Sequence, residues 1–239
     1  MAKPKKPVSG PMRTVVIAVD RSILWMSRRW LLVFSLLVGT YVSVPFMAPI
    51  LVNAGLSGPA TVIYKVYSPF CHQYAYRSWF LFGEEPFYMA PAFEERTGID
   101  PYTNTGRFAA RNFYGTPEMG YKVAYCERDV AIYAGILLAG MVYGGLRSRG
   151  VRVRPLHWLL YGLIGIGPIA LDGFSQLMAQ PPFSLPFLPF RESTPFLRSL
   201  TGFLFGTMNV WLAYPYVEES MVEIKAELTA KFKRAGLAT

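Results

Sequence analysis

Residues 30–52 read WLLVFSLLVGTYVSVPFMAPILV and contain no charged side chain over 23 positions. A helix of about 20 apolar residues, at a rise of about 1.5 Å each, crosses the roughly 30 Å hydrocarbon core of a bilayer. The stretch therefore predicts a transmembrane helix. Only 16% of the whole chain is charged, against about 25% in an average soluble domain. The low charge favours a protein that lies largely in the membrane.

Three further apolar stretches extend this prediction, at 129–146, 157–178 and 196–216. With 30–52 they predict an all-α, polytopic integral membrane protein of four transmembrane helices, whose membrane domain is 30–216. A basic segment, residues 1–29, precedes this domain. A charged, helix-forming tail, residues 217–239, follows it.

The basic residues predict the orientation of the chain. Seven Lys and Arg residues precede the first span, four lie between the second and third spans, and four lie in the tail. The loop 179–195 has only Arg191. Because cytoplasmic flanks are rich in Lys and Arg, we expect both termini in the cytoplasm and the long loop 53–128 outside. The net charge of +9 then favours membrane lipids, and not nucleic acid, as the partner.

The long loop contains the stretch YSPFCHQYAYRSWFLF, residues 67–82. It places one of two cysteines, Cys71, beside one of two histidines, His72. The other cysteine, Cys126, ends the loop. Between them, residues 83–120 are rich in Glu, Pro, Gly and Asn but keep several aromatic side chains. We interpret them as a folded insert and not a linker.

Polar side chains from four separate segments are expected to meet at the outer face of the membrane. They are Cys71, His72, Gln73 and Arg77; Cys126, Arg128 and Asp129; Asp172 and Gln176; and Arg198. Asp172 is the most informative, since a carboxylate within a span costs about 2.5–3.5 kcal/mol on insertion scales. It therefore indicates either a functional group or a buried ion pair, with Arg198 or Arg77 as the expected partner.

The two cysteines allow three interpretations. In an oxidising compartment Cys71 and Cys126 can form a disulfide. They can also bind Zn²⁺ together with His72 and with Asp129 or Asp172, because thiolate, imidazole and carboxylate groups all suit this ion. Adjacent Cys and His side chains diverge, so one of that pair would lie beside the ion without binding it. In the third interpretation both cysteines are reduced core residues.

The polar residues fall into four ordered motifs. They read CHQ-x3-RS-x4-G from Cys71 to Gly83, C-x-R-x3-IY-x-G from Cys126 to Gly135, P-x3-DG-x2-Q from Pro168 to Gln176, and R-x2-TG-x3-G from Arg198 to Gly206. In their order and spacing they resemble a family of uncharacterised prokaryotic membrane proteins, domain of unknown function 2085. The resemblance covers residues 57–206 apart from the insert. It implies a multi-pass protein of the prokaryotic cytoplasmic membrane and carries no established activity.

Two departures from the family pattern bear on the site. The second motif of the family usually holds a C-x-x-C pair, whereas this chain has Asp129 in place of the second cysteine. The insert 83–120 also replaces a short connection. With three cysteines and a histidine, members of the family resemble zinc or redox proteins. Asp129 can still bind zinc, but a chain with two cysteines also favours a disulfide.

Two functional hypotheses follow. In the first, the protein binds Zn²⁺ and is a hydrolase or transferase for a lipid-linked or anionic substrate. Asp172 then acts as a ligand or general base, and Arg77 and Arg198 bind the anionic headgroup. In the second, the protein is a non-enzymatic subunit or assembly factor of a larger membrane complex. A Cys71–Cys126 disulfide and an Arg–Asp network then stabilise it.

Overall fold

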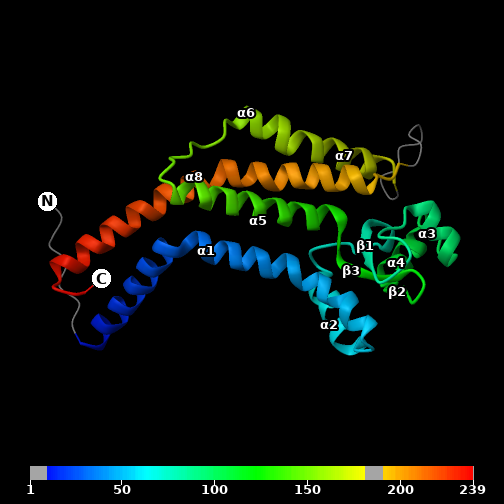
Figure 1. Ribbon diagram of the computed structural model, residues 1–239, viewed down its shortest axis with the longest axis horizontal. Coiled ribbons are helices and arrows are strands. Elements are labelled where there is room, and N and C mark those ends of the chain that lie inside the picture. Colours follow the sequence, from blue (N-terminus) through cyan, green and yellow to red (C-terminus); the bar gives the residue numbers. More distant parts are fainter. Residues whose placement is uncertain (1–9, 181–190, 239) are drawn as a thin grey trace.

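The computed structural model describes residues 10–180 and 191–238, which are mostly helical, so the predicted all-α membrane fold is confirmed. Figure 1 shows the long helices side by side in one bundle. They are α1 (Pro11–Asn53), α5 (Glu127–Ser148), the continuous segment α6, η2 and α7 (Trp158–Leu160, Tyr161–Ile166 and Gly167–Met178), and α8 (Pro195–Arg234). The predicted loop 179–195 falls mostly on residues 181–190, outside the described residues.

Within the described ranges, three helices are long and apolar enough to cross a membrane: Pro11–Asn53, Glu127–Ser148 and Trp158–Met178. They contain the first two predicted spans, and the third predicted span apart from His157. The fourth predicted span, 196–216, is helical within α8 but does not meet the same test of apolarity. The reason is that α8 carries buried polar and small residues, such as Arg198, Thr201 and Gly202, on the face toward its neighbours.

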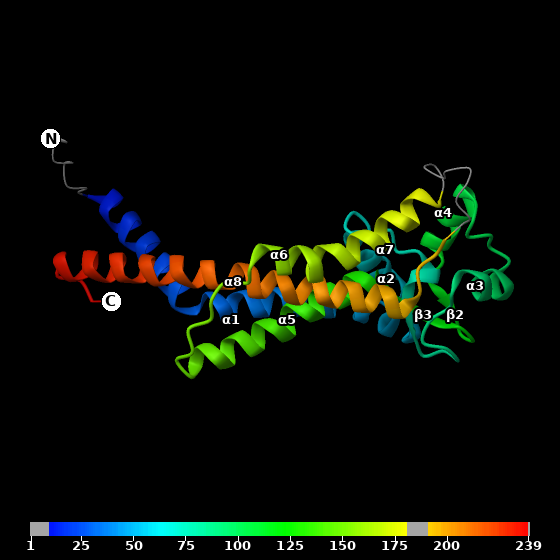
Figure 2. The ribbon, with the colours of Figure 1, turned by 90° about the horizontal axis from the view of Figure 1, so that it is seen from above.

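The first helix is longer than the sequence predicted. We expected the span to begin at Trp30, after a separate basic segment, but α1 runs without a break from Pro11. Its first half packs against the end of α8, beyond the bundle, where Leu24, Leu228 and Phe232 form a buried cluster. Figures 1 and 2 place the first turns of α1 and the last turns of α8 at the same end of the molecule.

At the opposite end, residues 57–126 form a small folded unit (Figure 2). It contains α2 (Ser57–Tyr67), the short 3-10 helix η1 (Ala75–Arg77), β1 (Ser78–Leu81), α3 (Ala90–Thr97), α4 (Asn104–Asn112), β2 (Gly115–Thr116) and β3 (Gly120–Cys126). The strands form an antiparallel sheet in the order β1-β3-β2. This sheet was not predicted. Its register pairs Ser78 with Cys126, which brings the first motif to the second.

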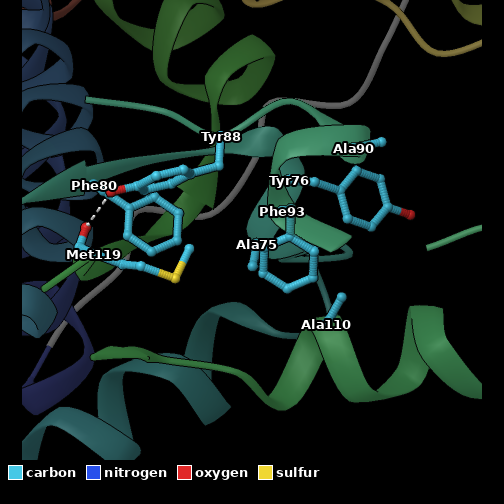
Figure 3. Packing of buried hydrophobic residues seen from close by; sticks show 8 residues of the cluster. All are labelled: Ala75, Tyr76, Phe80, Tyr88, Ala90, Phe93, Ala110 and Met119. Carbon is cyan, nitrogen blue, oxygen red and sulfur yellow. Dashed lines mark hydrogen bonds between the residues drawn. The ribbon is translucent and has the colours of Figure 1, made fainter. Parts of the chain in front are cut away.

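The insert has a core of its own (Figure 3). Aromatic side chains from the insert and from the first motif pack together there: Tyr76, Phe80, Tyr88 and Phe93 are each at most 3% exposed. The Tyr88 hydroxyl donates to the Met119 carbonyl oxygen at 3.2 Å, so its polar end is satisfied. The prediction that residues 83–120 fold and do not form a linker is confirmed.

Glycines let α5 and α8 cross at very short range. A Cβ added to Gly206 would lie 2.1 Å from the Ile132 carbonyl oxygen, and one added to Gly202 would lie 2.6 Å from that of Arg128. Small residues at such positions allow two membrane helices to approach backbone to backbone. The glycines of the fourth motif thus bring Arg198 close to the start of α5.

Candidate functional site

A pocket of about 540 Å³ opens where the sheet meets the ends of α5, α7 and α8. All four motifs contribute to its walls. The contributing residues are Cys71, His72, Gln73, Arg77, Cys126, Arg128, Asp129, Gln176 and Arg198. Asp172 is buried next to Gly173 of the wall and is 5% exposed. The structure therefore brings together the segments that we expected to converge, with Asp172 behind the surface of the pocket.

One wall carries two thiols and a carboxylate. The ligand atoms of Cys71, Cys126 and Asp129 all lie within 4.8 Å of one another. The Cys126 thiol donates to Asp129 Oδ2 at 3.0 Å. The backbone N–H groups of Gln73 and Cys126 donate to Cys71 Sγ at 3.5 and 3.3 Å. Both cysteines are free thiols in this structure.

His72 lies apart from these three ligand atoms. Its side chain is exposed and its ring packs against that of Tyr74, with 5.4 Å between the centroids. Partial burial, and then the positive charge of Arg77, lowers the pKa of His72. The expected divergence of neighbouring Cys and His side chains explains why His72 lines the pocket without joining the cluster.

Gln73 shapes the turn that carries Cys71. Its backbone has a positive φ of 54°, a conformation uncommon for residues other than glycine. Its side-chain amide is buried and donates to the carbonyl oxygens of Tyr64 and Ala124, each at 2.9 Å. The amide thus ties α2 to β3 and orients the cysteine between them.

Lys122 supports the turn that carries Cys71 and Gln73. The sequence alone did not predict this role. Its side chain is fully buried, and its Nζ donates to the carbonyl oxygens of Gln73 at 2.7 Å and Arg111 at 2.5 Å. The rings of Tyr64 and Tyr114 lie 5.8 and 5.7 Å from Nζ. The available signal was a lone lysine in the otherwise uncharged strand GYKVAYC.

The stability of the folded chain is expected to depend on Lys122 and on pH. Burial lowers the pKa of its ammonium group from 10.5 to about 7. Between these values the unfolded chain binds more protons than the folded chain, so stability rises with pH. Lys122→Met should remove this rise. It should also lower stability at neutral pH by about 2 kcal/mol, because the carbonyl groups of Gln73, Ala110 and Arg111 lose their donor.

Thermal unfolding in detergent at pH 7, 8 and 9 measures both effects. The control is Lys65→Met, since Lys65 is exposed. A pH dependence that is equally steep in Lys122→Met and in the unmodified chain would contradict the prediction.

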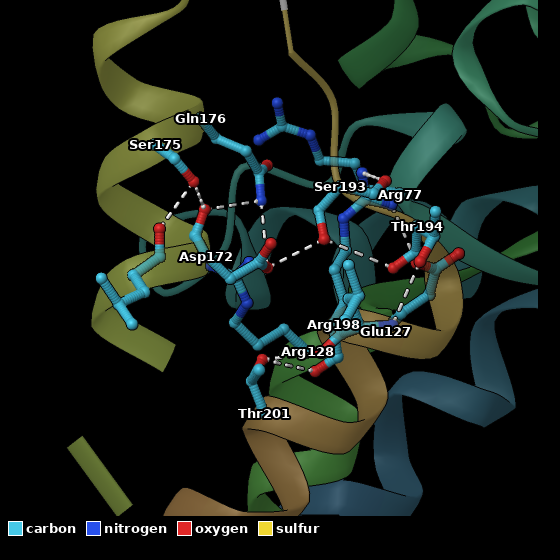
Figure 4. A network of polar contacts seen from close by, with 12 residues as sticks. Arg77, Glu127, Arg128, Asp172, Ser175, Gln176, Ser193, Thr194, Arg198 and Thr201 are labelled. Carbon is cyan, nitrogen blue, oxygen red and sulfur yellow. Dashed lines mark hydrogen bonds and ion pairs between the residues drawn. The ribbon is translucent and has the colours of Figure 1, made fainter. Parts of the chain in front are cut away.

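Asp172 is the centre of one polar network (Figure 4). Its carboxylate forms ion pairs with Arg128 and, at 3.0 Å, with Arg191. It also accepts hydrogen bonds from Ser193 at 2.8 Å and Gln176 at 3.2 Å. The prediction that Arg198 or Arg77 would pair with Asp172 is therefore wrong. Arg128 lies in the first turn of α5, and its guanidinium group reaches across to Gly173 and Asp172 of α7.

Glu192 is the centre of a second network. It forms an ion pair with Arg77 at 2.6 Å and another with Arg198. Arg198 also pairs with Glu127 at 2.9 Å, where the two side chains are 3% and 1% exposed. The Gln180 amide donates to Glu192 at 2.8 Å and accepts from Arg77 at 2.9 Å. Glu127 lies within the second motif and Glu192 precedes the fourth, but the sequence does not show that they pair with these arginines.

Comparison with known proteins agrees with the motifs. Residues 109–212 match the profile of a family described as predicted membrane protein (DUF2085). The matched range contains the second, third and fourth motifs. An uncharacterized protein of Methanocaldococcus jannaschii, MJ1492, is 26% identical over 195 residues, which cover 80% of this chain and 93% of that protein. No solved structure matches significantly. The resemblance inferred from the motifs is confirmed: over residues 109–212 this chain matches the DUF2085 family of predicted membrane proteins.

Proposed function

We propose that this membrane protein binds Zn²⁺ through Cys71, Cys126 and Asp129 and acts on an anionic or lipid-linked substrate in the adjoining pocket. The observation that carries the proposal is that three ligand atoms lie within 4.8 Å of one another on the pocket wall. Two thiolates and a carboxylate suit Zn²⁺. Three protein ligands beside an open pocket are typical of catalytic zinc sites, whose fourth position takes water or substrate.

The proposed site faces the outside of a prokaryotic cytoplasmic membrane. The support comes from the charged ends of the bundle. The arginines from Arg147, in the last turn of α5, to Arg154, beyond it, lie at the opposite end of α5 from Cys126. Because basic flanks remain in the cytoplasm, this orientation places both termini inside and the pocket outside.

The surrounding residues have separate roles in this proposal. A bound Zn²⁺ would supply a Lewis acid for a phosphoryl or carbonyl oxygen. Asp172 already receives two ion pairs and two hydrogen bonds from side chains and lies behind the wall. We therefore propose that Asp172 positions Arg128. This role replaces the two that the sequence suggested, zinc ligand and general base.

Metal analysis of the purified full-length chain tests the zinc site. We expect about one Zn²⁺ per chain, and its loss in Cys71→Ser and Cys126→Ser, because each removes a thiolate ligand. Asp129→Asn should weaken zinc binding, whereas His72→Ala should retain the metal. Melting temperatures of the same samples distinguish loss of the ion from loss of the fold.

The second candidate function, a non-enzymatic subunit or assembly factor, predicts the opposite result. The observation that favours it is that the two free sulfurs lie close together, so that a small shift would let them form a disulfide. Protein without stoichiometric metal, with Cys71 and Cys126 joined in a peptide identified by mass spectrometry, would overturn the zinc proposal.

A further inference from the structure

We propose that the arginine wall of the pocket binds a phosphate group, with Arg77 and Arg128 as the contacting residues. The inference names the substrate class for the site proposed above and rests on that function. Its first support is charge. Arg77, Arg107, Arg128 and Arg198 all line the pocket, and Asp129 is the one acidic side chain among the described residues of the lining. A cleft lined by one sign of charge concentrates ligands of the opposite sign.

The second support is that Arg77 and Arg128 are held in place while they keep unused donors. Each binds a carboxylate through Nη2: Arg77 binds Glu192, and Arg128 binds Asp172. No hydrogen bond to a described residue uses Nη1 of either side chain, and their Nε atoms are buried without a partner among those residues. A guanidinium group has five N–H donors in a rigid plane. Phosphate oxygens match this geometry with paired hydrogen bonds.

Exposure distinguishes the contacting arginines from a positioning one. The side chains of Arg77 and Arg128 are 18% and 22% exposed, so part of each reaches the pocket. Arg198 is 3% exposed and uses both Nη atoms on Glu127, Glu192 and the Ser193 carbonyl oxygen. We therefore assign to Arg128 the headgroup binding that the sequence predicted for Arg198. Arg198 instead orients the Glu192 carboxylate, which holds Arg77.

The walls of the pocket suit a phosphate that is still attached to a larger group. The thiol and carboxylate cluster and the arginines line the same cavity. The lining also includes the exposed apolar side chains of Phe70 and Leu177. The shared chemistry is a phosphate oxyanion, and it can come from free phosphate or from a lipid headgroup beside these apolar residues.

Binding measurements on the full-length chain in phosphatidylcholine nanodiscs test the inference. One titration uses inorganic phosphate and the other uses short-chain phosphatidic acid. We expect Arg77→Gln and Arg128→Gln to weaken binding by about tenfold or more, because each removes charge-assisted hydrogen bonds. Arg77→Lys keeps the charge beside Glu192 but loses the planar donors, and it should also bind more weakly while remaining folded. The matched control is Arg96→Gln, whose exposed side chain lies on the insert.

Competition between the two probes identifies the source of the phosphate. Displacement of phosphatidic acid by inorganic phosphate would support a free phosphate ligand, and tighter binding of the lipid would support a headgroup. Absence of binding by the unmodified chain, or unchanged binding in folded Arg77→Lys and Arg128→Gln, would overturn the inference. Zinc content measured on the same samples keeps the two proposals separate: an unmodified chain that holds zinc but binds no phosphate refutes only the phosphate site.

Discussion

Gly206→Ala is expected to lower the free energy of unfolding by about 3 kcal/mol, because the new methyl group meets backbone that has no room to move. A Cβ at this position would lie 2.1 Å from the Ile132 carbonyl oxygen. The helices must therefore separate, which loosens contacts along the whole crossing of α5 and α8. Unfolding of the purified chain in mixed micelles, followed by circular dichroism as sodium dodecyl sulfate is added, measures the change.

Gly145→Ala is the matched control on α5. Its Cβ would come no closer than 3.9 Å to a neighbouring side chain, the flexible end of Arg149. Alanine also favours a helix over glycine by about 1 kcal/mol. We therefore expect this variant to be unchanged or slightly more stable. Equal stability of Gly206→Ala and Gly145→Ala would show that α5 and α8 do not cross at backbone contact.

Arg198→Met is expected to destabilise the chain by about 3–5 kcal/mol, because it leaves a buried carboxylate without its counter-ion. The cost falls mainly on Glu127, which is 1% exposed and pairs with Arg198 at 2.9 Å. Glu192 loses one of its two arginines but keeps Arg77. The same unfolding assay detects the effect.

A double variant tests the cause. Adding Glu127→Gln to Arg198→Met removes the unpaired charge. The destabilisation of the double variant should therefore be smaller, by more than about 1 kcal/mol, than the sum of the destabilisations of the two single variants. Arg96→Met serves as a control for an exposed ion pair. Its side chain and that of Glu84 are 45% and 61% exposed, and such pairs contribute at most about 1 kcal/mol. Strict additivity of Arg198→Met and Glu127→Gln would contradict the buried ion pair.

The helical bundle could be predicted because its signal is local. An uncharged run such as residues 30–52 has one stable form in a bilayer, since a helix satisfies every backbone polar group within the segment. The same reasoning could not predict that α1 begins as early as Pro11. The segment before Trp30 is stabilised by contacts with Leu228 and Phe232, which lie near the other end of the chain. It also missed the sheet, whose strands β1 and β3 are short and lie far apart in sequence.

The candidate site was predictable as a set of residues but not as a set of partners. Cysteines, arginines and an aspartate in membrane-facing segments are costly enough to indicate a shared site, and the pocket contains most of them. The pairing of each carboxylate with its arginine depends on how far one helix is shifted along its neighbour, and a shift of one turn would change the partners. The short crossing at Gly202 selects Arg128 for Asp172 and leaves Arg198 to Glu127.

The sequence by itself determined the helical membrane fold and the residue types at one end of the bundle, because hydrophobic length and charge act within each segment. The tertiary structure decided that Cys71, Cys126 and Asp129 form one cluster while His72 stands apart. It also decided that Arg77 and Arg128 line the pocket while each is held by a carboxylate. These outcomes depend on the register of β1 with β3 and on the glycine contact of α5 with α8. Both are distances between segments that are remote in the chain, and no local pattern encodes them.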